Sequence, residues 1–167
     1  MPYYIGGMEP SKWSVPSNDG WHQCDFVNER WIKRNNELLV VARLTVQGKN
    51  WDQVESLEKF ENAEVVDHSN YQLNQIIIPH KALTELVNEV EHWLKSPRNF
   101  KVQLCDNDQQ LLSIAVEDKH RLITSKRKPV FSLACSSGRT GFECHYIIDP
   151  TCLSILHEGL VSSLQLR

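Results

Sequence analysis

The feature that most limits the fold is a pair of apolar segments joined by a short turn sequence, and it occurs twice in the second half of the chain. Residues 100–105 and 111–116 flank Asp106-Asn107-Asp108, while residues 130–135 and 142–148 flank a stretch rich in Ser and Gly. Connections this short join antiparallel neighbours, because a parallel crossover needs about a dozen residues or more. The sequence therefore predicts two hairpins of an antiparallel sheet.

Further strands are predicted in the first half. Residues 37–47 are largely apolar, begin after the turn residues Asn35-Asn36 and end at Gly48. Residues 23–28 alternate between polar and apolar side chains, and residues 71–78 form another β-like run. The intervening stretch from 50 to 67 has apolar residues spaced by three, which predicts a short helix whose apolar stripe drifts around its axis.

Two amphipathic helices are predicted. The first opens near Pro79 and ends at Ser96-Pro97, and the second is capped by Asp149 and opened by Pro150. Their inward faces are expected to carry Leu83, Leu86, Val87, Val90 and Leu94, and Leu153, Leu156, Leu160 and Leu164. The expected class is α+β, a two-layer arrangement in which an antiparallel β-sheet is flanked by two main amphipathic helices.

The domain organisation follows from length and composition. The chain has 167 residues, which suits one domain. Residues 1–20 mix Gly, Pro, Ser and Asn with scattered apolar side chains, so we expect an irregular N-terminal arm, held to the domain by Trp13. Residues 21–167 are expected to form a single α+β domain.

Composition argues against several classes of partner. No run approaches the roughly 20 apolar residues that span a bilayer, and the first residues lack the pattern of a signal peptide. A net charge of −3 disfavours direct binding to nucleic acid or to an anionic membrane. We expect a cytoplasmic protein with no membrane and no nucleic-acid partner.

The cysteines indicate reduced thiols. There are five, an odd number, and Cys105, Cys135 and Cys144 lie in apolar, strand-like stretches where a thiol behaves as a small hydrophobe. Cys and His gather in the C-terminal third without the close pairs that structural zinc sites use. We expect no metal, no cofactor and no disulfide.

No catalytic signature is present in the sequence. Phosphate-binding loops, nucleophile elbows and zinc-protease helices are all absent. The expectation is that the chain is not an enzyme. A cysteine–histidine site remains an alternative, because such residues meet in space and not in sequence.

An acidic run is the candidate partner-binding site. Between residues 52 and 67 every third residue is acidic, opposed only by Lys59. The partner-binding residues expected here are Trp51, Asp52, Glu55, Glu58, Glu61, Glu64 and Asp67. A solvated face is the plainer interpretation of such a run, while Trp51 fits an interface anchor and a core residue equally well.

The order of elements resembles the small immunity proteins of bacterial polymorphic-toxin and contact-dependent growth-inhibition systems, in particular a Wap-type immunity family. The resemblance lies in four segments: residues 38–44, the helix at 83–94, Phe131-Ser132-Leu133, and the tail from Tyr146 to Leu160. It implies an antiparallel sheet with flanking helices, no catalysis, and tight binding of one cognate toxin C-terminal domain. The arm before Trp21 and the acidic stretch are longer than in that family.

The expected function is therefore stoichiometric inhibition of a toxin, with a nuclease as one candidate because its phosphate-attracting cleft would complement an acidic patch. An adaptor or chaperone-like binding module with another partner is the first alternative. A small enzyme with an unrecognised Cys/His site is the second. The sequence does not indicate an oligomeric state.

Overall fold

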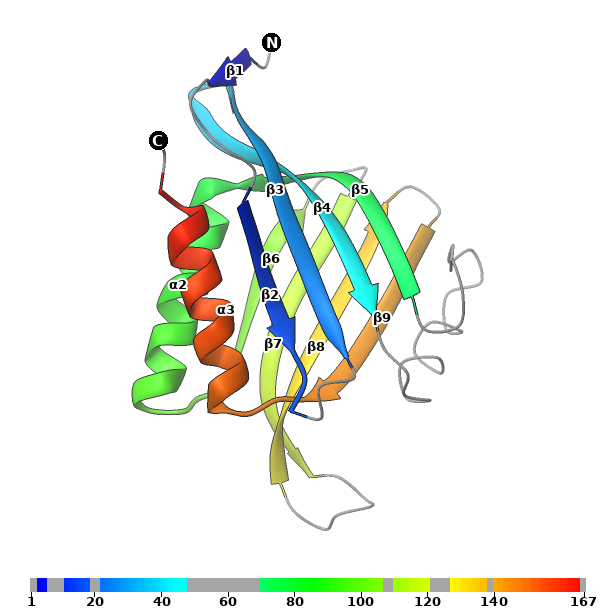
Figure 1. Cartoon of the computed structure of the whole chain (residues 1–167), viewed down its shortest axis with the longest axis vertical. Helices are drawn as coiled ribbons and strands as arrows, with labels where there is room; N and C mark the ends of the chain where they lie inside the picture. The colour runs from blue at the N-terminus through cyan, green and yellow to red at the C-terminus, as the bar shows by residue number, and fades with distance from the viewer. Residues whose placement is uncertain are drawn as a thin grey trace.

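The structure is a computed structural model, and it describes residues 3–5, 11–18, 22–47, 70–106, 110–120, 127–137 and 140–165. The elements within these ranges are two helices and nine strands, shown in Figure 1. They are β1 (Tyr3–Ile5), β2 (Ser11–Pro16), β3 (Gln23–Arg34), β4 (Glu37–Gln47), β5 (Asn70–Pro79), α2 (His80–Lys95), β6 (Phe100–Asp106), β7 (Gln110–His120), β8 (Arg127–Ser137), β9 (Thr140–Ile147) and α3 (Pro150–Ser163).

The first sheet is built around the β3–β4 hairpin. Its order is β1-β3-β4-β5, with β2 also paired to β3, and all of its pairings are antiparallel. The hairpin turns at Asn35 and Asn36, which have positive φ values of 51° and 63°. Asn tolerates this left-handed conformation better than most residues, so the predicted turn is confirmed together with the strand at 37–47.

The second sheet contains the two predicted hairpins. Its order is β6-β7-β8-β9, again antiparallel throughout. The α+β class is thus confirmed, but the strands divide between two sheets where the sequence predicted one. The two-layer arrangement with flanking helices stays a prediction.

The N-terminal arm is more ordered than the sequence predicted. The expectation of irregular structure over 1–20 is wrong for Tyr3–Ile5 and Ser11–Pro16, which pair with β3. The long β3 explains the error, because it offers a backbone edge that short, weakly patterned segments can join. Trp13 does hold the arm to the domain, because its side chain is buried. Its ring stacks on that of Phe26 with 3.8 Å between the ring centroids, and its Nε1 donates a hydrogen bond to Asn28 Oδ1 at 3.2 Å.

One hydrophobic core serves both sheets and both helices. The sheets face each other with their strands crossing, and the helices lie side by side along one side of the pair (Figure 1). Large aromatic side chains fill the centre, including Trp31, Phe26 and Phe131. A smaller cluster of Ile32, Leu39 and Val41, with Ile77 against it, belongs to the face of β3 and β4 that does not contribute to this core.

Helix α2 is amphipathic as predicted, with one correction. Leu83, Leu86, Val87 and Val90 are buried, but Leu94 is 37% exposed and Trp93 takes the inward position. Helical spacing places Leu94 on the same face as Val87 and Val90, so its exposure belongs to its position in the last turn of α2, which ends at Lys95. Neither helix of the described ranges is long and apolar enough to cross a membrane.

Helix α3 begins as predicted, because the Asp149 side chain accepts a hydrogen bond from the Cys152 amide at 2.9 Å. Leu153, Leu156 and Leu160 are buried, and Leu164 packs partly buried against the core. The helix lies directly against β2 at Gly159. A Cβ at that position would lie 2.9 Å from the Cα of Trp13.

Candidate functional site

The predicted partner-binding residues lie outside the described part of the chain. Trp51, Asp52, Glu55, Glu58, Glu61, Glu64 and Asp67 all fall between β4 and β5. The described ends of these strands, Gln47 and Asn70, are register partners in the first sheet. The structure therefore places the two ends of the intervening segment side by side and leaves the acidic surface itself a prediction.

The five cysteines are free and buried. Burial raises the pKa of the Cys105 thiol to about 12 and that of Cys152 to about 11. The Cys144 thiol lies 3.9 Å from that of Cys24, and the hydrogen bond between them, together with burial, raises its pKa well above the usual value. Thiols held protonated are poor nucleophiles, so Cys105, Cys144 and Cys152 fit the predicted structural role.

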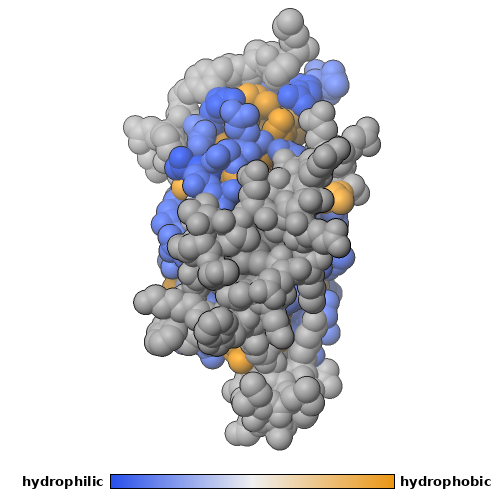
Figure 2. Space-filling model, turned by 90° about the vertical axis from the view of Figure 1, so that its right-hand side faces the viewer, coloured by the Kyte–Doolittle hydropathy of each residue, from blue (hydrophilic) through white to orange (hydrophobic). Residues whose placement is uncertain are grey.

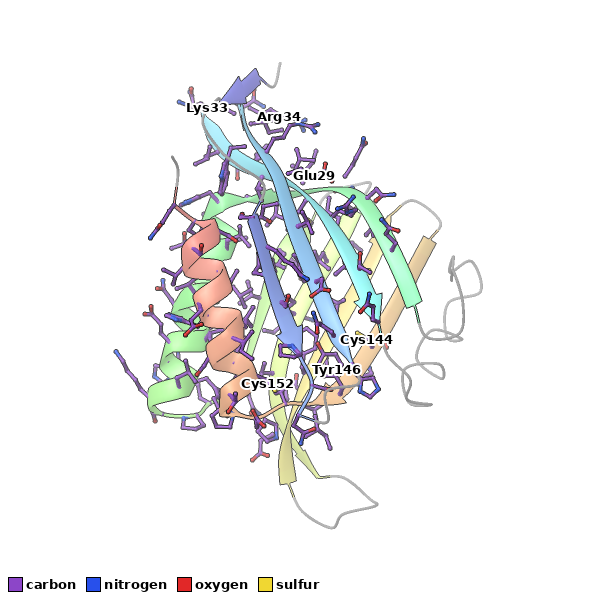
Figure 3. All side chains as sticks on the ribbon, in the orientation of Figure 1. Glu29, Lys33, Arg34, Cys144, Tyr146 and Cys152 are labelled. Carbon is purple, nitrogen blue, oxygen red and sulfur yellow. The ribbon has the colours of Figure 1, made fainter. Side chains whose placement is uncertain are left out.

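Tyr146 lies in the same region as these thiols. Its hydroxyl donates a hydrogen bond to the backbone carbonyl of Val15, and burial is the main cause of its strongly raised pKa. Figure 3 shows Cys144, Tyr146 and Cys152 toward one end of the molecule and Lys33 and Arg34 at the opposite end. The buried polar groups are thus separated from the charged end formed by the β3–β4 turn.

One serine–histidine contact lies on the outer face of the second sheet. Ser132 Oγ is 2.8 Å from His145 Nδ1, and Glu143 Oε2 is 3.6 Å from His145 Nε2. This set has the residue types of a nucleophile, a base and an orienting acid. However, Ser132 is in the middle of β8, paired on both sides, so the nearby backbone amides serve the sheet ladder. They are not available as oxyanion donors, which acyl transfer requires.

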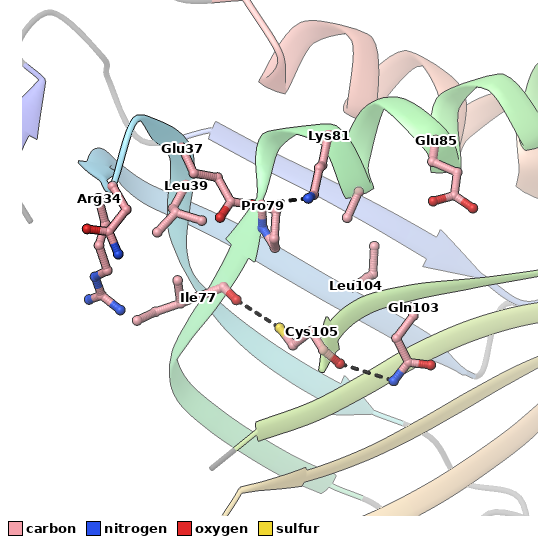
Figure 4. A pocket seen from close by; sticks show the side chains of 12 residues that line it. Arg34, Glu37, Leu39, Ile77, Pro79, Lys81, Glu85, Gln103, Leu104 and Cys105 are labelled. Atoms are coloured by element: carbon pink, nitrogen blue, oxygen red, sulfur yellow. Dashed lines mark hydrogen bonds and ion pairs between the residues drawn. The ribbon is translucent and has the colours of Figure 1, made fainter. Parts of the chain in front are cut away.

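A hollow lies at the corner where the β3–β4 turn, the end of β5, the start of α2 and the end of β6 meet. Its volume is about 650 Å³, within the range of sites that bind small molecules or short peptide segments. We call it the corner hollow (Figure 4). Its apolar lining residues are Leu39, Ile77, Pro79, Ala82 and Leu104, and its charged ones are Arg34, Glu37, Lys81 and Glu85.

Beside the corner hollow, side chains of the second sheet form hydrogen bonds with the backbone of β5. The Gln110 amide receives a hydrogen bond from the Ile77 N–H at 3.2 Å and donates to the Gln75 carbonyl at 2.9 Å. The Cys105 thiol donates to the Ile77 carbonyl at 2.9 Å. A positive φ of 56° at Gln75 marks the bend that presents these groups. The second sheet is thereby attached to the first beside the hollow.

The charges around the corner hollow are only partly paired. Lys81 Nζ and Glu37 Oε1 form an ion pair at 3.6 Å across the rim. Within the described part of the chain, no ion pair or side-chain hydrogen bond engages Arg34 or Glu85. These two side chains are on different sides of the apolar floor in Figure 4. Among the described residues, the hollow therefore presents one cation and one carboxylate without an ion-pair partner.

No group of three or more potential metal ligands occurs among the described residues. Figure 2 shows a side on which the described residues are mostly hydrophilic; hydrophobic residues gather in a small group near one end and otherwise appear singly. The corner hollow, with its volume of about 650 Å³, its apolar floor and its charged border, is the candidate site that we consider further.

Sequence reasoning did not identify this site. The turn sequence Arg34-Asn35-Asn36-Glu37 places opposite charges at a hairpin tip, which is a usable local signal. Nothing local indicates that Leu104 and Glu85 lie beside that turn, because the hollow joins residues of β3, β4, β5, α2 and β6. Comparisons with protein-family models, with curated proteins and with solved structures gave no match to this chain.

Proposed function

We propose that the chain is an immunity protein that binds the C-terminal domain of a cognate toxin and neutralises it by stoichiometric protein–protein contact. The observation that carries the proposal is the corner hollow, where an apolar floor is bordered by charges of both signs. Protein interfaces have this composition, with an apolar centre and a polar rim. The complex would bury about 800 Å² on each partner.

The raised pKa values of Cys105, Cys144 and Cys152 support a binding role over a catalytic one. The pairing of Ser132 with strands on both sides supports it as well. Reduced thiols also fit a cytoplasmic site of action, which belongs to the proposal. The Ser132–His145 contact favours a small enzyme as a second candidate. A fluorophosphonate reacts covalently with an activated serine. If it labels the native chain at Ser132 and does not label Ser132→Ala, the chain is a small enzyme.

Co-purification tests the immunity proposal. The gene of an immunity protein lies directly after a large toxin gene, so the chain should form a one-to-one complex with the tagged C-terminal domain of that neighbour's product. Co-expression should also remove the toxicity of the domain. An adaptor or chaperone-like module would show neither the gene order nor the rescue, and a toxin domain that stays active beside an equimolar amount of this chain would refute the proposal.

The acidic run provides the second arm of the test. Reversing three of its carboxylates, Asp52, Glu58 and Glu64, to Lys should slow association with a basic toxin domain and restore toxicity. Affinity of the native pair should fall as ionic strength rises, and the reversed variant should lose that dependence. If the triple variant binds the toxin domain as tightly as the native chain does at low salt, the acidic run is a solvated face that does not contact the toxin.

A further inference from the structure

We propose that the corner hollow binds one extended segment of the partner in which an acidic, an apolar and a basic side chain point to the same side. The inference rests on the proposed function for the identity of the partner. It goes further in naming the recognition site and the chemistry of the segment that occupies it.

The two unpaired charges define the ends of the segment. Arg34 is the last residue of β3, and Glu85 lies in the second turn of α2. Neither has an ion-pair partner within the described ranges. An arginine fork is suited to a carboxylate, which it can hold through two parallel hydrogen bonds, and Glu85 is suited to a lysine or an arginine.

The floor between them supplies an apolar contact. Leu39 and Leu104 are almost fully buried, while Ile77 and Pro79 are partly exposed at the hollow. A branched aliphatic side chain placed there would remove apolar surface of both partners from water, which is favourable by about 25 cal/mol per Å². The middle side chain of the segment is therefore apolar.

The charge pattern disfavours ligands of a single sign. A phosphate or a polyanion attracted by Arg34 and Lys81 would also approach Glu37 and Glu85. A polycation would meet the opposite difficulty at Arg34. In an extended chain, alternate side chains point to the same side, so residues one, three and five of a segment present their side chains to the floor together.

Blocked pentapeptides test this arrangement without the toxin. The bipolar probes are acetyl-Asp-Ser-Leu-Ser-Lys-amide and its reverse, acetyl-Lys-Ser-Leu-Ser-Asp-amide, which cover both chain directions. The single-sign probes place Asp at both ends or Lys at both ends. Each is titrated into the ¹⁵N-labelled full-length chain while backbone amide shifts are followed by NMR.

We expect one bipolar probe to shift the amides of Leu39, Ile77 and Leu104. It should bind about threefold more tightly than either single-sign probe, as expected of one exposed ion pair. Arg34→Glu should transfer the preference to the probe with two Lys residues. Arg30→Glu, the same charge change at an exposed position of β3 outside the hollow, should leave the native preference unchanged.

A double reversal separates charge recognition from general damage to the fold. Arg34→Glu combined with Glu85→Arg restores one charge of each sign and should select the bipolar probe of opposite direction. Equal binding of all four probes, or shifts confined to other regions, would overturn the inference. If the toxin domain co-purifies while no probe binds, the proposed function stands and the hollow is not its recognition site. If a bipolar probe binds as expected while no toxin does, the hollow is confirmed as a peptide site and the immunity proposal fails.

Discussion

Gly159→Ala is the substitution whose outcome the structure determines most directly. A Cβ at this position would lie 2.8 Å from the Cβ of Trp13 and 2.9 Å from its Cα, both closer than side-chain atoms tolerate. Trp13 has little freedom to withdraw, because it stacks on Phe26, bonds to Asn28, and belongs to a strand paired along its length with β3. Helix α3 would have to move away from β2.

The magnitude follows from two opposing effects. Replacing a glycine within a helix by alanine stabilises the helix by about 1 kcal/mol. Overpacking of a well-filled contact costs about 1–3 kcal/mol, and here the obstructing atoms include backbone. The net expectation is a loss of up to roughly 2 kcal/mol, which for a chain of this length lowers Tm by up to about 8 °C.

Thermal unfolding followed by circular dichroism measures the effect. Ser154→Ala is the matched control, since Ser154 is exposed on the same helix and the change should raise Tm slightly through helix propensity alone. If Gly159→Ala raises Tm as much as the control does, α3 does not press against β2 and the reasoning fails.

Four further outcomes are expected. Leu86→Asp should lower the free energy of unfolding by more than about 4 kcal/mol in urea titrations, because the carboxylate would be buried without a partner; an unchanged midpoint would mean that α2 does not face the core. Tyr146→Phe should cost about 1–3 kcal/mol by leaving the buried Val15 carbonyl unpaired, and a neutral result would dismiss that hydrogen bond. Asn36→Val should lower Tm while Asn36→Gly preserves or raises it, because φ is 63° at this turn; equal effects would contradict the turn geometry. Finally, the Cys105 thiol keeps its proton in the folded state up to a pKa of about 12 but loses it near 9 when unfolded, so the free energy of unfolding should fall as pH rises from 9 toward 12. Cys105→Ala should make that fall shallower, and an unaltered slope would remove Cys105 as a cause.

The sequence predicted those elements whose signals are local. The bounds of β4, the Asn35-Asn36 turn, both later hairpins and the Asp149 cap depend on neighbouring residues, and each is confirmed. The division into two sheets was not predictable in the same way. Alternation shows which side of a strand is buried, but it does not show which other strand pairs with it.

The candidate site was still less accessible to sequence reasoning. Arg34 and Leu104 become neighbours of one hollow because the shared core and the contacts of Gln110 and Cys105 with β5 bring the two sheets together. Those contacts are made by an amide and a thiol whose roles depend on a backbone bend at Gln75. Trp13 illustrates the same limit, since its burial was expected but the strand that carries it was not.

The contact between β2 and α3 has a consequence for synthesis on the ribosome. Trp13 emerges early, but the helix that covers it is translated more than a hundred residues later. At 5–20 residues per second, the nascent chain carries this aromatic side chain without its α3 contact for roughly seven to thirty seconds. The contact between Trp13 and α3 can therefore form only after residues 150–163 have been made, and until then this apolar surface is exposed to aggregation or to chaperones.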